Sequence, residues 1–349
     1  MAAVTQAQSV VVRAATPDEG RTVAGLWREL WDAHEAWGGY PGTRDVRVYE
    51  QLAVRLGEDA RVRGGQPVLG RHVHLVAQVD GSVVGQVEGW FERHGIDEAT
   101  PYTCEVRSLI VSSRTRARGV GRSLLEGLAR VSRQMSRNAP VVMAAEVLEP
   151  NPAHAFYAKV GYAPVSWTAR TMTDSAADGD PSHRPGDIFF ARPASPNDAL
   201  PIAMLDPALA ERRRMQGDVR FDRPRAVDAT FVGALAAELA RPVGAHEQCE
   251  LVAMDASGTV RASASLTVMS LDPPFVPARR GLLGRFAIDP AIDPRPVVGP
   301  LVRLGRRLAL LRGAATLELT DLDPPGSPVH EGAMLAGSQA WSRIVERYA

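Results

Sequence analysis

Four arginines crowd one short stretch of the chain, "RTRARGVGRSLLEGLARV" at residues 114–131: Arg114, Arg116, Arg118 and Arg122. Leucines at helical spacing follow, so the arginines lie at the start of a predicted helix, where the helix dipole is already positive. Gly119 and Gly121 would let main-chain N–H groups converge on an anion such as a pyrophosphate. A bound polyanion would resolve this conflict of charge. The alternative is a solvated basic helix start, balanced by acids such as Glu126.

Two side chains near this turn could move protons. Glu105 lies on the predicted strand "CEVRSLIVS" that leads into the turn, and by alternation it shares a face with Arg107, Leu109 and Val111. Glu105 is a candidate base, although Arg107 could equally hold it in a structural ion pair. Tyr157 lies in the short predicted helix "PAHAFYAKV", where it either packs the helix or donates a proton from its neutral phenol.

The helix that contains Tyr157 has well-defined ends. Asn151 is a suitable N-cap before Pro152 at the first helical position, and Gly161 ends the segment. His154 is interpreted as a packing or surface residue. Aromatic residues recur at helical spacing on the first predicted helix, where they either pack the core or form one wall of a pocket: Trp27, Trp31, His34 and Trp37.

The elements around these residues can be placed in order. Predicted strands cover "SVVVRA", "HVHLVAQV", "VVGQVEGWF", "CEVRSLIVS", "VVMAAEVL" and "APVSWTARTM". Predicted helices begin near Pro17, near residue 44, at the arginine-rich stretch and at "PAHAFYAKV". Asp80-Gly81-Ser82 is a hairpin turn. The pattern β-α-α-β-β-β-α-β-α-β indicates the α/β (α+β) class, with a mixed sheet between helices.

The chain also repeats itself in one register. "RAATPD" at 13–18 recurs as "RPASPN" at 192–197, "LVAQVDGSVVG" at 75–85 as "LVAMDASGTVRA" at 251–262, and "NPAHAFYAKVGY" at 151–162 as "SPVHEGAMLAGS" at 327–338. The offsets of 179, 176 and 176 residues keep the same order, which indicates a duplicated domain. We expect a first domain at 1–175, a linker at 176–187 and a second domain at 188–349.

Composition argues against several classes of function. The 40 Lys and Arg residues balance 40 Asp and Glu residues, so no net charge points to a nucleic acid or a membrane as partner. Cys104 and Cys249 are far apart, which argues against a disulfide framework or a metal site. No signal peptide or membrane-length apolar run is found, so we expect a cytoplasmic protein.

The turn Arg116-x-x-Gly119-x-Gly121 after a strand, with Asn151 and Tyr157 downstream, resembles the GNAT superfamily of N-acetyltransferases. The order of elements matches this family over the first copy and more loosely over the second. The resemblance implies two tandem GNAT folds, each a mixed twisted central sheet flanked by helices. It also implies acetyl-CoA as cosubstrate, with its pyrophosphate at the turn and its ribose phosphate near the guanidinium groups.

The resemblance implies roles for individual residues. Some members carry a catalytic glutamate at the position of Glu105, and the family places a tyrosine near the coenzyme A sulfur at the position of Tyr157. The main chain of residues 109–111 would bind the pantetheine arm and polarise the acetyl carbonyl. The residues expected to contact acetyl-CoA are Leu109, Ile110, Val111, Arg116, Ala117, Arg118, Gly119, Val120, Gly121, Arg122, Ser123, Asn151 and Tyr157.

The second copy lacks parts of this pattern. Ala333 stands at the position of Tyr157, and "DPAIDPRPVVGPLVRLGRRL" replaces the glycine-rich turn with a stretch that contains prolines. Proline has no N–H to offer a phosphate. Gly299 could match Gly121 if one residue is inserted, but we expect an impaired site for acetyl-CoA in this copy.

We therefore expect an acetyl-CoA-dependent N-acetyltransferase that acts on a small-molecule amine in its first copy, as a monomer or homodimer. Two alternatives remain. The first copy could hold acetyl-CoA structurally while the second transfers an acyl group, as tandem family members resembling mycothiol synthase can do, or the chain could be a non-catalytic acyl-CoA sensor. Its richness in arginine and alanine suggests secondary metabolism as a setting.

Overall fold

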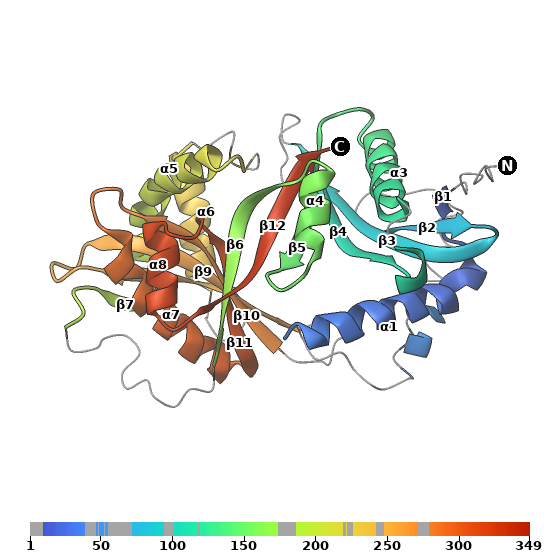
Figure 1. Cartoon of the computed structure of the whole chain (residues 1–349). Helices are drawn as coiled ribbons and strands as arrows, with labels where there is room; N and C mark the ends of the chain where they lie inside the picture. The colour runs from blue at the N-terminus through green and yellow to red at the C-terminus, as the bar shows by residue number, and fades with distance from the viewer. Residues whose placement is uncertain are drawn as a thin grey trace. The chain divides into compact units, whose positions relative to one another are not determined.

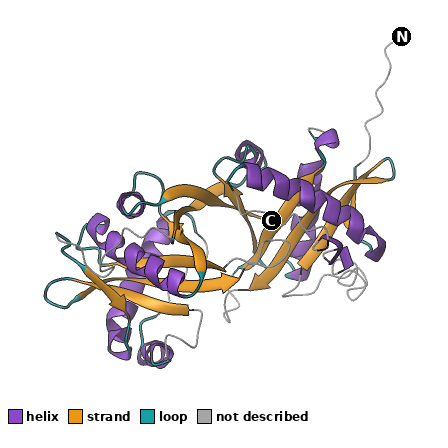
Figure 2. Ribbon diagram, turned by 90° about the horizontal axis from the view of Figure 1, so that it is seen from below, coloured by secondary structure: helices purple, strands orange, loops and turns teal. Residues whose placement is uncertain are grey.

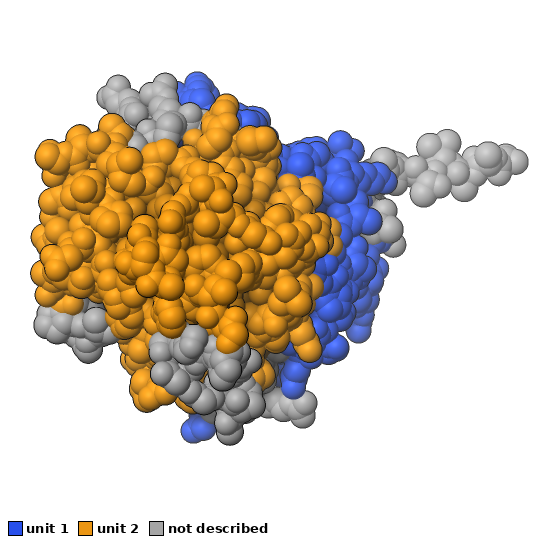
Figure 3. Space-filling view, turned by 90° about the vertical axis from the view of Figure 1, so that its left-hand side faces the viewer, with its two compact units in different colours: residues 1–163, 272–276, 345–349 blue, residues 164–271, 277–344 orange. Residues whose placement is uncertain are grey.

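The computed structural model describes residues 10–38, 47, 49–51, 53–54, 72–93, 101–116, 119–173, 186–218, 221, 226–241, 248–270 and 279–349. The chain forms two compact units (Figure 3), and each unit combines segments that are not contiguous in the sequence. Unit 1 comprises residues 1–163, 272–276 and 345–349, and unit 2 comprises residues 164–271 and 277–344. Most of the predicted helix near residues 44–57 and most of the predicted linker lie outside the described residues.

Unit 1 is built on a mixed sheet. Its strands are β1 (Val11–Ala14), β2 (His72–Val79), β3 (Ser82–Arg93), β4 (Tyr102–Val111) and β5 (Val141–Leu148), in that spatial order. Neighbouring strands are antiparallel except β4 and β5, which are parallel. Asp80 and Gly81 both have positive φ, 49° and 80°, as a type I′ hairpin turn between β2 and β3 requires.

Helices cover both faces of this sheet (Figures 1 and 2). They are α1 (Gly20–Ala36), α3 (Val120–Met135) and α4 (Ala153–Lys159), with short 3₁₀ helices at Pro17–Glu19 and Ser113–Thr115. On one face α1 packs Trp27 and Trp31 around Val76 of β2. On the other face α3 packs Leu124 and Leu128 into a core shared with the alternate residues of the strands. None of the helices in the described ranges is long and apolar enough to cross a membrane.

A β-bulge in β4 changes which side chains share a face. Glu88 of β3 pairs with Ser108, whereas the next residue, Gly89, pairs with Val106, so Arg107 is an extra residue in β4. Cys104 and Val106 before the bulge, and Leu109 and Val111 after it, all pack into the core beneath α3. Glu105 therefore lies on the opposite face from Leu109 and Val111, and the expectation that they share a face is wrong.

Strands β4 and β5 separate beyond the bulge. Their parallel register runs from Tyr102 opposite Val141 to Val106 opposite Ala145. Within this described part of the sheet, residues 107–111 of β4 have no partner in β5, although they remain paired with β3 on their other edge. This fork leaves main-chain hydrogen-bonding groups available to an extended ligand.

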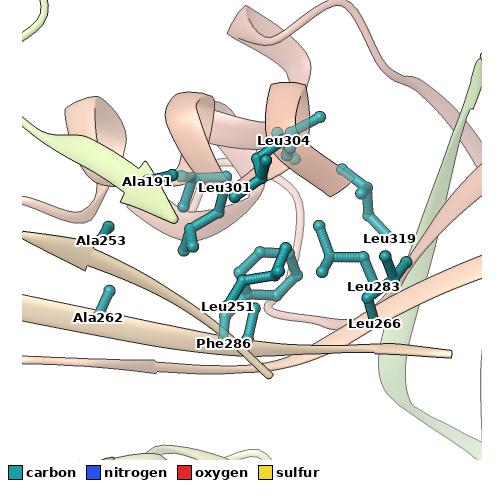
Figure 4. Packing of buried hydrophobic residues seen from close by; sticks show 14 of the residues in the cluster. Ala191, Leu251, Ala253, Ala262, Leu266, Leu283, Phe286, Leu301, Leu304 and Leu319 are labelled. Atoms are coloured by element: carbon teal, nitrogen blue, oxygen red, sulfur yellow. The ribbon is translucent and has the colours of Figure 1, made fainter. Parts of the chain in front are cut away.

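Unit 2 repeats the same arrangement. Its strands and helices are β6 (Ala163–Met172), β7 (Phe190–Pro193), α5 (Ala199–Met215), α6 (Ala229–Leu239), β8 (Gln248–Met254), β9 (Val260–Ser270), β10 (Arg279–Ile288), α7 (Pro294–Leu311), β11 (Ala314–Leu322), α8 (Pro328–Leu335) and β12 (Gln339–Tyr348). The strand order is β12-β6-β11-β10-β9-β8-β7, where β12 contributes its residues up to 344. Leu301 and Leu304 of α7 pack onto Leu251, Leu283 and Phe286 of the sheet (Figure 4).

The closing strands were not placed by the sequence pattern. β6 follows the first copy in the chain, yet its residues 164–172 belong to unit 2 and pair antiparallel with β11. In unit 1, the last residues of the chain take the place beside β5, where the Ala349 N–H donates to the Val141 carbonyl at 2.9 Å. The sequence alternation that identifies a strand does not identify its neighbour.

A matching ion pair supports the duplication in atomic detail. Arg13 and Glu19 bridge the end of β1 and the start of α1 at 2.6 Å, and Arg192 and Asp198 bridge β7 and α5 at 2.7 Å. In both units the acid also closes a capping box at the following 3₁₀ turn. The spacing of six residues between base and acid is the same in both copies.

Candidate active site

The N-terminus of α3 is shaped for an anion. Its N-cap, Gly119, adopts the left-handed conformation with φ of 77° and has no side chain with which to cap the helix. The first intrahelical bond runs from the Ser123 N–H to the Gly119 carbonyl at 3.0 Å. The helix itself therefore offers no acceptor to the N–H groups of Val120, Gly121 and Arg122. These amides and the helix dipole would favour a negative group at this point.

Gly121 allows the end of α3 to approach the end of β4. A Cβ atom at this position would lie 3.3 Å from Cζ of Phe156 and 3.7 Å from Cγ2 of Val111. The helix start, the last residue of the forked strand and the first turns of α4 therefore meet at Gly121. The structure brings together the predicted phosphate turn and the predicted pantetheine-binding strand.

The arginines near this helix start have partners of their own. Arg116 Nε donates to the Val111 carbonyl at 3.3 Å, and Arg122 pairs with Glu126 at 3.0 Å on the exposed surface. The second contact matches the alternative of a solvated basic helix start, but an exposed pair of this kind contributes only about 0.3–0.5 kcal/mol and leaves the guanidinium accessible. Ala117 and Arg118 lie outside the described residues.

Tyr157 lies on α4 among other aromatic rings. Its ring contacts those of Tyr162 and Phe156, with centroids 5.1 and 5.4 Å apart. Burial raises the pKa of Tyr157, so the phenol stays protonated at neutral pH and can donate a hydrogen bond. Asn151 caps the same helix, because its Oδ1 accepts from the Ala153 N–H at 2.9 Å.

Glu105 is held in an ion pair on the surface. Arg107 Nε donates to Glu105 Oε2 at 3.1 Å, and the guanidinium of Arg107 lies 4.7 Å from the centre of the Trp90 ring. Glu105 pairs across the sheet with Trp90 and with Ala144, so it lies in the closed half of β4, before the fork. The structural ion pair that the sequence offered as an alternative is present.

Unit 1 contains a buried polar cluster that was not predicted from the sequence. Gln86 Nε2 donates to Ser108 Oγ at 2.9 Å, and Ser108 Oγ donates to Glu88 Oε2 at 3.3 Å. Gln86 and Glu88 are 1% exposed and Ser108 is 4% exposed. The cluster lies on the α1 face of the sheet, opposite the core beneath α3. The only trace of it in the sequence is that "VVGQVEGWF" carries polar residues at alternate positions of an otherwise apolar strand.

Aromatic residues of α1 cover the same face of the sheet. Trp27 and Trp31 are buried, and successive ring contacts join Trp27, Trp31, His34 and Trp37 with centroid distances from 5.4 to 6.5 Å. Burial lowers the pKa of His34 to about 4, so this side chain is neutral at pH 7. Glu29 ties α1 to the end of β4, because its Oε1 accepts from the Ser113 N–H at 3.0 Å.

In unit 2 the corresponding helix start is closed to an anion. The N-cap of α7 is Asp293, whose carboxylate accepts from the Arg295 N–H at 3.0 Å. Arg295 in turn pairs with Glu331 of α8 at 2.6 Å. Pro294 at the first position of α7 has no N–H, and Gly299 lies within the second turn rather than at the helix start. The start of α7 therefore has two carboxylates and a proline without an N–H, whereas the start of α3 has amides without an acceptor in the helix.

The fork of unit 2 is also occupied. The register of β10 with β11 ends where Leu283 lies opposite Leu319. Beyond that point, Arg212 of α5 donates from Nη2 to the Phe286 carbonyl and from Nε to Asp323, the latter at 3.1 Å. Gln216 holds the same carboxylate at 2.7 Å. At the position of Tyr157, α8 carries the buried Ala333, which has no phenol.

Comparisons with known proteins agree with this geometry. Residues 28–162 match the model of the acetyltransferase (GNAT) family. The structure is similar to a GCN5-related N-acetyltransferase from Sphaerobacter thermophilus, with 15% identity, a TM-score of 0.56, and 97% of this chain and 95% of that chain covered. No curated protein sequence matches the chain.

Two further solved structures are similar over nearly the whole chain. One is a glucosamine N-acetyltransferase region of a fungal multi-domain β-N-acetylglucosaminidase, with 14% identity, a TM-score of 0.51, and 97% of this chain and 38% of that chain covered. The other is a tandem GNAT protein from the clavulanic acid biosynthesis pathway, with 17% identity, a TM-score of 0.47 and 98% of each chain covered. Residues 28–162 thus match the acetyltransferase (GNAT) family, and the repeated fold is similar to that of solved N-acetyltransferases over nearly the whole chain.

Proposed function

We propose that unit 1 is an acetyl-CoA-dependent N-acetyltransferase that acts on a small-molecule amine. One observation supports this most strongly. Within the part of the chain that matches the acetyltransferase family, the uncapped N-terminus of α3 meets the open fork between β4 and β5 at Gly121. A ligand with a pyrophosphate at one end and an extended arm at the other fits these two features.

Acetyl-CoA has both parts, and the residues for each can be named. The amides of Val120, Gly121 and Arg122 would bind the pyrophosphate, with Arg116 and Arg122 as partners for phosphate oxygens. The main chain of residues 109–111 would bind the pantetheine arm along the edge of the fork. Of the remaining residues assigned from the sequence, Gly119 and Ser123 adjoin the helix start, Asn151 caps α4, and Ala117 and Arg118 lie outside the described residues.

Transfer would be direct, from the thioester to the amine. The departing thiolate benefits from a proton, and we assign its donation to the phenol of Tyr157. A cysteine intermediate is disfavoured on physical grounds: Cys104 is buried beneath α3, and burial raises the pKa of this thiol to about 12. The assignment of Glu105 as base stays a prediction from the sequence.

Unit 2 would not bind acetyl-CoA in this scheme. Asp293 and Glu331 would repel a pyrophosphate at α7, and Arg212 already uses a main-chain acceptor in the fork. Arg212 is itself held by the buried Asp323, so displacing it would leave that carboxylate without its ion pair. The second copy then serves as a structural part of the protein.

The experiment is a screen of amines and amino acids against acetyl-CoA, read by release of free thiol and by isothermal titration of acetyl-CoA. We expect binding of acetyl-CoA and thiol release that depends on an amine. Absence of acetyl-CoA binding contradicts the proposal. Binding without thiol release for any amine in a broad panel would instead identify a sensor.

A further inference from the structure

Packing of the sheet alone does not require the polar side chains of Gln86, Glu88 and Ser108 to be buried. A carboxylate at 1% exposure loses its hydration, and it is retained where specific groups hold it. Here Ser108 donates to Glu88 Oε2 at 3.3 Å, and Gln86 donates to the same hydroxyl at 2.9 Å. Glu88 is thus oriented by a chain of hydrogen bonds that runs across two strands.

This cluster lies at the fork rather than in the closed half of the sheet. Ser108 is the first residue of β4 after the bulge and directly precedes Leu109, whose main chain belongs to the edge assigned to the pantetheine arm. Glu88 is the cross-strand partner of Ser108. Glu105, by contrast, lies before the bulge, is paired with Arg107, and has Ala144 of β5 beside it.

We propose that Glu88 receives the ammonium group of the acceptor and removes its proton. This inference rests on the proposed function of unit 1. One ammonium proton passes to the Glu88 carboxylate, and the free amine attacks the thioester carbon. The C–N bond forms, the C–S bond breaks, and the second amine proton goes to the thiolate by way of Tyr157. The products are an acetamide and free coenzyme A, and Glu88 returns its proton to water.

The surroundings of Glu88 indicate the class of acceptor. On the α1 face, His74 of β2 is the cross-strand partner of Glu88. Val76, the partner of Gln86, packs there with Trp27 and Trp31, and α1 also carries His34 in its neutral form. Within the described residues, the buried Trp27 Nε1 and Gln86 Oε1 have no hydrogen-bond partner. One donor and one acceptor are thus left for a polar atom of a ligand. We infer a primary amine carried on an aromatic or apolar body.

The test uses the full chain with four probe amines. Tryptamine and phenethylamine represent the proposed class, and spermidine and glutamate represent polycationic and acidic amines. We expect thiol release with the first two at a kcat/KM at least ten times that of the others. Glu88→Gln should lower kcat/KM about 10²–10³-fold while the Kd for acetyl-CoA stays within twofold, which also shows that unit 1 is folded.

Matched variants separate a catalytic from a structural role. Glu92→Gln changes the same residue type on the same face of β3, four residues away, and should leave kcat/KM unchanged. Glu88→Asp keeps the carboxylate and should recover part of the activity that Glu88→Gln loses. A structural role alone would instead lower stability in both Glu88 variants.

Three results would overturn the inference while leaving the proposed function intact. The first is a Glu88→Gln variant that keeps more than a third of the wild-type kcat/KM. The second is a loss seen in Glu105→Gln but not in Glu88→Gln. The third is acetylation of spermidine or glutamate in preference to the aryl amines. Failure of the wild-type chain to bind acetyl-CoA would overturn the proposed function itself.

Discussion

Arg212 of α5 donates a hydrogen bond to the main-chain carbonyl of Phe286, in the half of β10 that has separated from β11. Among the residues that the structure describes, no arginine makes a comparable bond to the separated half of β4 from a half-buried position. There Arg116 donates to the Val111 carbonyl from an exposed side chain that a ligand can displace. The two copies of one fold thus differ in whether the fork is open.

The open fork of unit 1 and the closed fork of unit 2 predict how many acetyl-CoA molecules one chain binds. We expect one acetyl-CoA per chain at saturation, because the half-buried Arg212, held by the buried Asp323, closes the fork of unit 2. Native mass spectrometry of the intact chain counts bound molecules directly. Two acetyl-CoA molecules per chain would show that unit 2 retains a donor site.

A negative charge at the start of α3 should strongly weaken the binding of acetyl-CoA. Gly121→Asp places a carboxylate beside the amides assigned to the pyrophosphate, so we expect the Kd for acetyl-CoA to rise at least 100-fold, measured by isothermal titration. Gly25→Asp is the matched control, since Gly25 is exposed on α1 and a Cβ there meets nothing within 4 Å. An unchanged Kd in Gly121→Asp would support the solvated basic helix start instead.

Loss of the Tyr157 hydroxyl should slow acetyl transfer without weakening the binding of acetyl-CoA. Tyr157→Phe keeps the ring contacts with Phe156 and Tyr162 but removes the proton donor, so kcat should fall about 10²-fold. Tyr162→Phe is the control, because its buried hydroxyl has no hydrogen-bond partner in the part of the chain that the structure describes. Equal activity of both variants would leave Tyr157 with a packing role only.

Chemical modification should find Cys104 inert. Its thiol is 0% exposed and its pKa is raised by burial to about 12, so we expect negligible reaction with a disulfide reagent in the native protein at pH 8. Cys104→Ala should retain turnover. A strong loss of kcat in this variant, with acetyl-CoA binding preserved, would point to a covalent acyl-cysteine step.

The paired acids at the start of each copy predict how stability depends on pH. Hydrogen bonds from Arg13 lower the pKa of Glu19 from 4.5 to about 2. For Asp198, burial alone would raise the pKa, but hydrogen bonds from Arg192 and Ser195 outweigh it and lower the pKa from 3.8 to about 2. Because both folded-state pKa values are depressed, the stabilisation is present above about pH 4.5 and is lost as the pH falls towards 2.

Variants of these acids should flatten that dependence. In Glu19→Gln, the thermal midpoint should fall less between pH 4.5 and 2.5 than it does in the wild-type protein, and Asp198→Asn should behave alike. Thermal scans by circular dichroism at several pH values measure this. A parallel fall in the variants and the wild type would show that these pairs do not set the acid response.

Most single elements could be predicted from the sequence because they depend on local patterns. Alternating residues identified β2 and β3, and the Asp80-Gly81 turn fixed the hairpin between them. The helix α4 follows from its cap at Asn151. The start of α3 was placed too early, since residues 113–115 form a separate 3₁₀ turn before Gly119.

Features that depend on distant parts of the chain could not be predicted in this way. The bulge at Arg107 is visible only in the pairing of β4 with β3, and it reverses the face that Glu105 was expected to share. The bond between Glu88 and Ser108 joins residues 20 apart in sequence, and Arg212 reaches Phe286 across 74 residues. No local spacing records such contacts, so the buried polar cluster became visible only in three dimensions.

A crystal structure of the full chain with bound coenzyme A would test the central claim most directly. We predict the pyrophosphate against the main-chain N–H groups of residues 120–122 and the pantetheine arm along residues 109–111 of β4. Coenzyme A bound at the start of α7, or placed away from α3 altogether, would contradict this account.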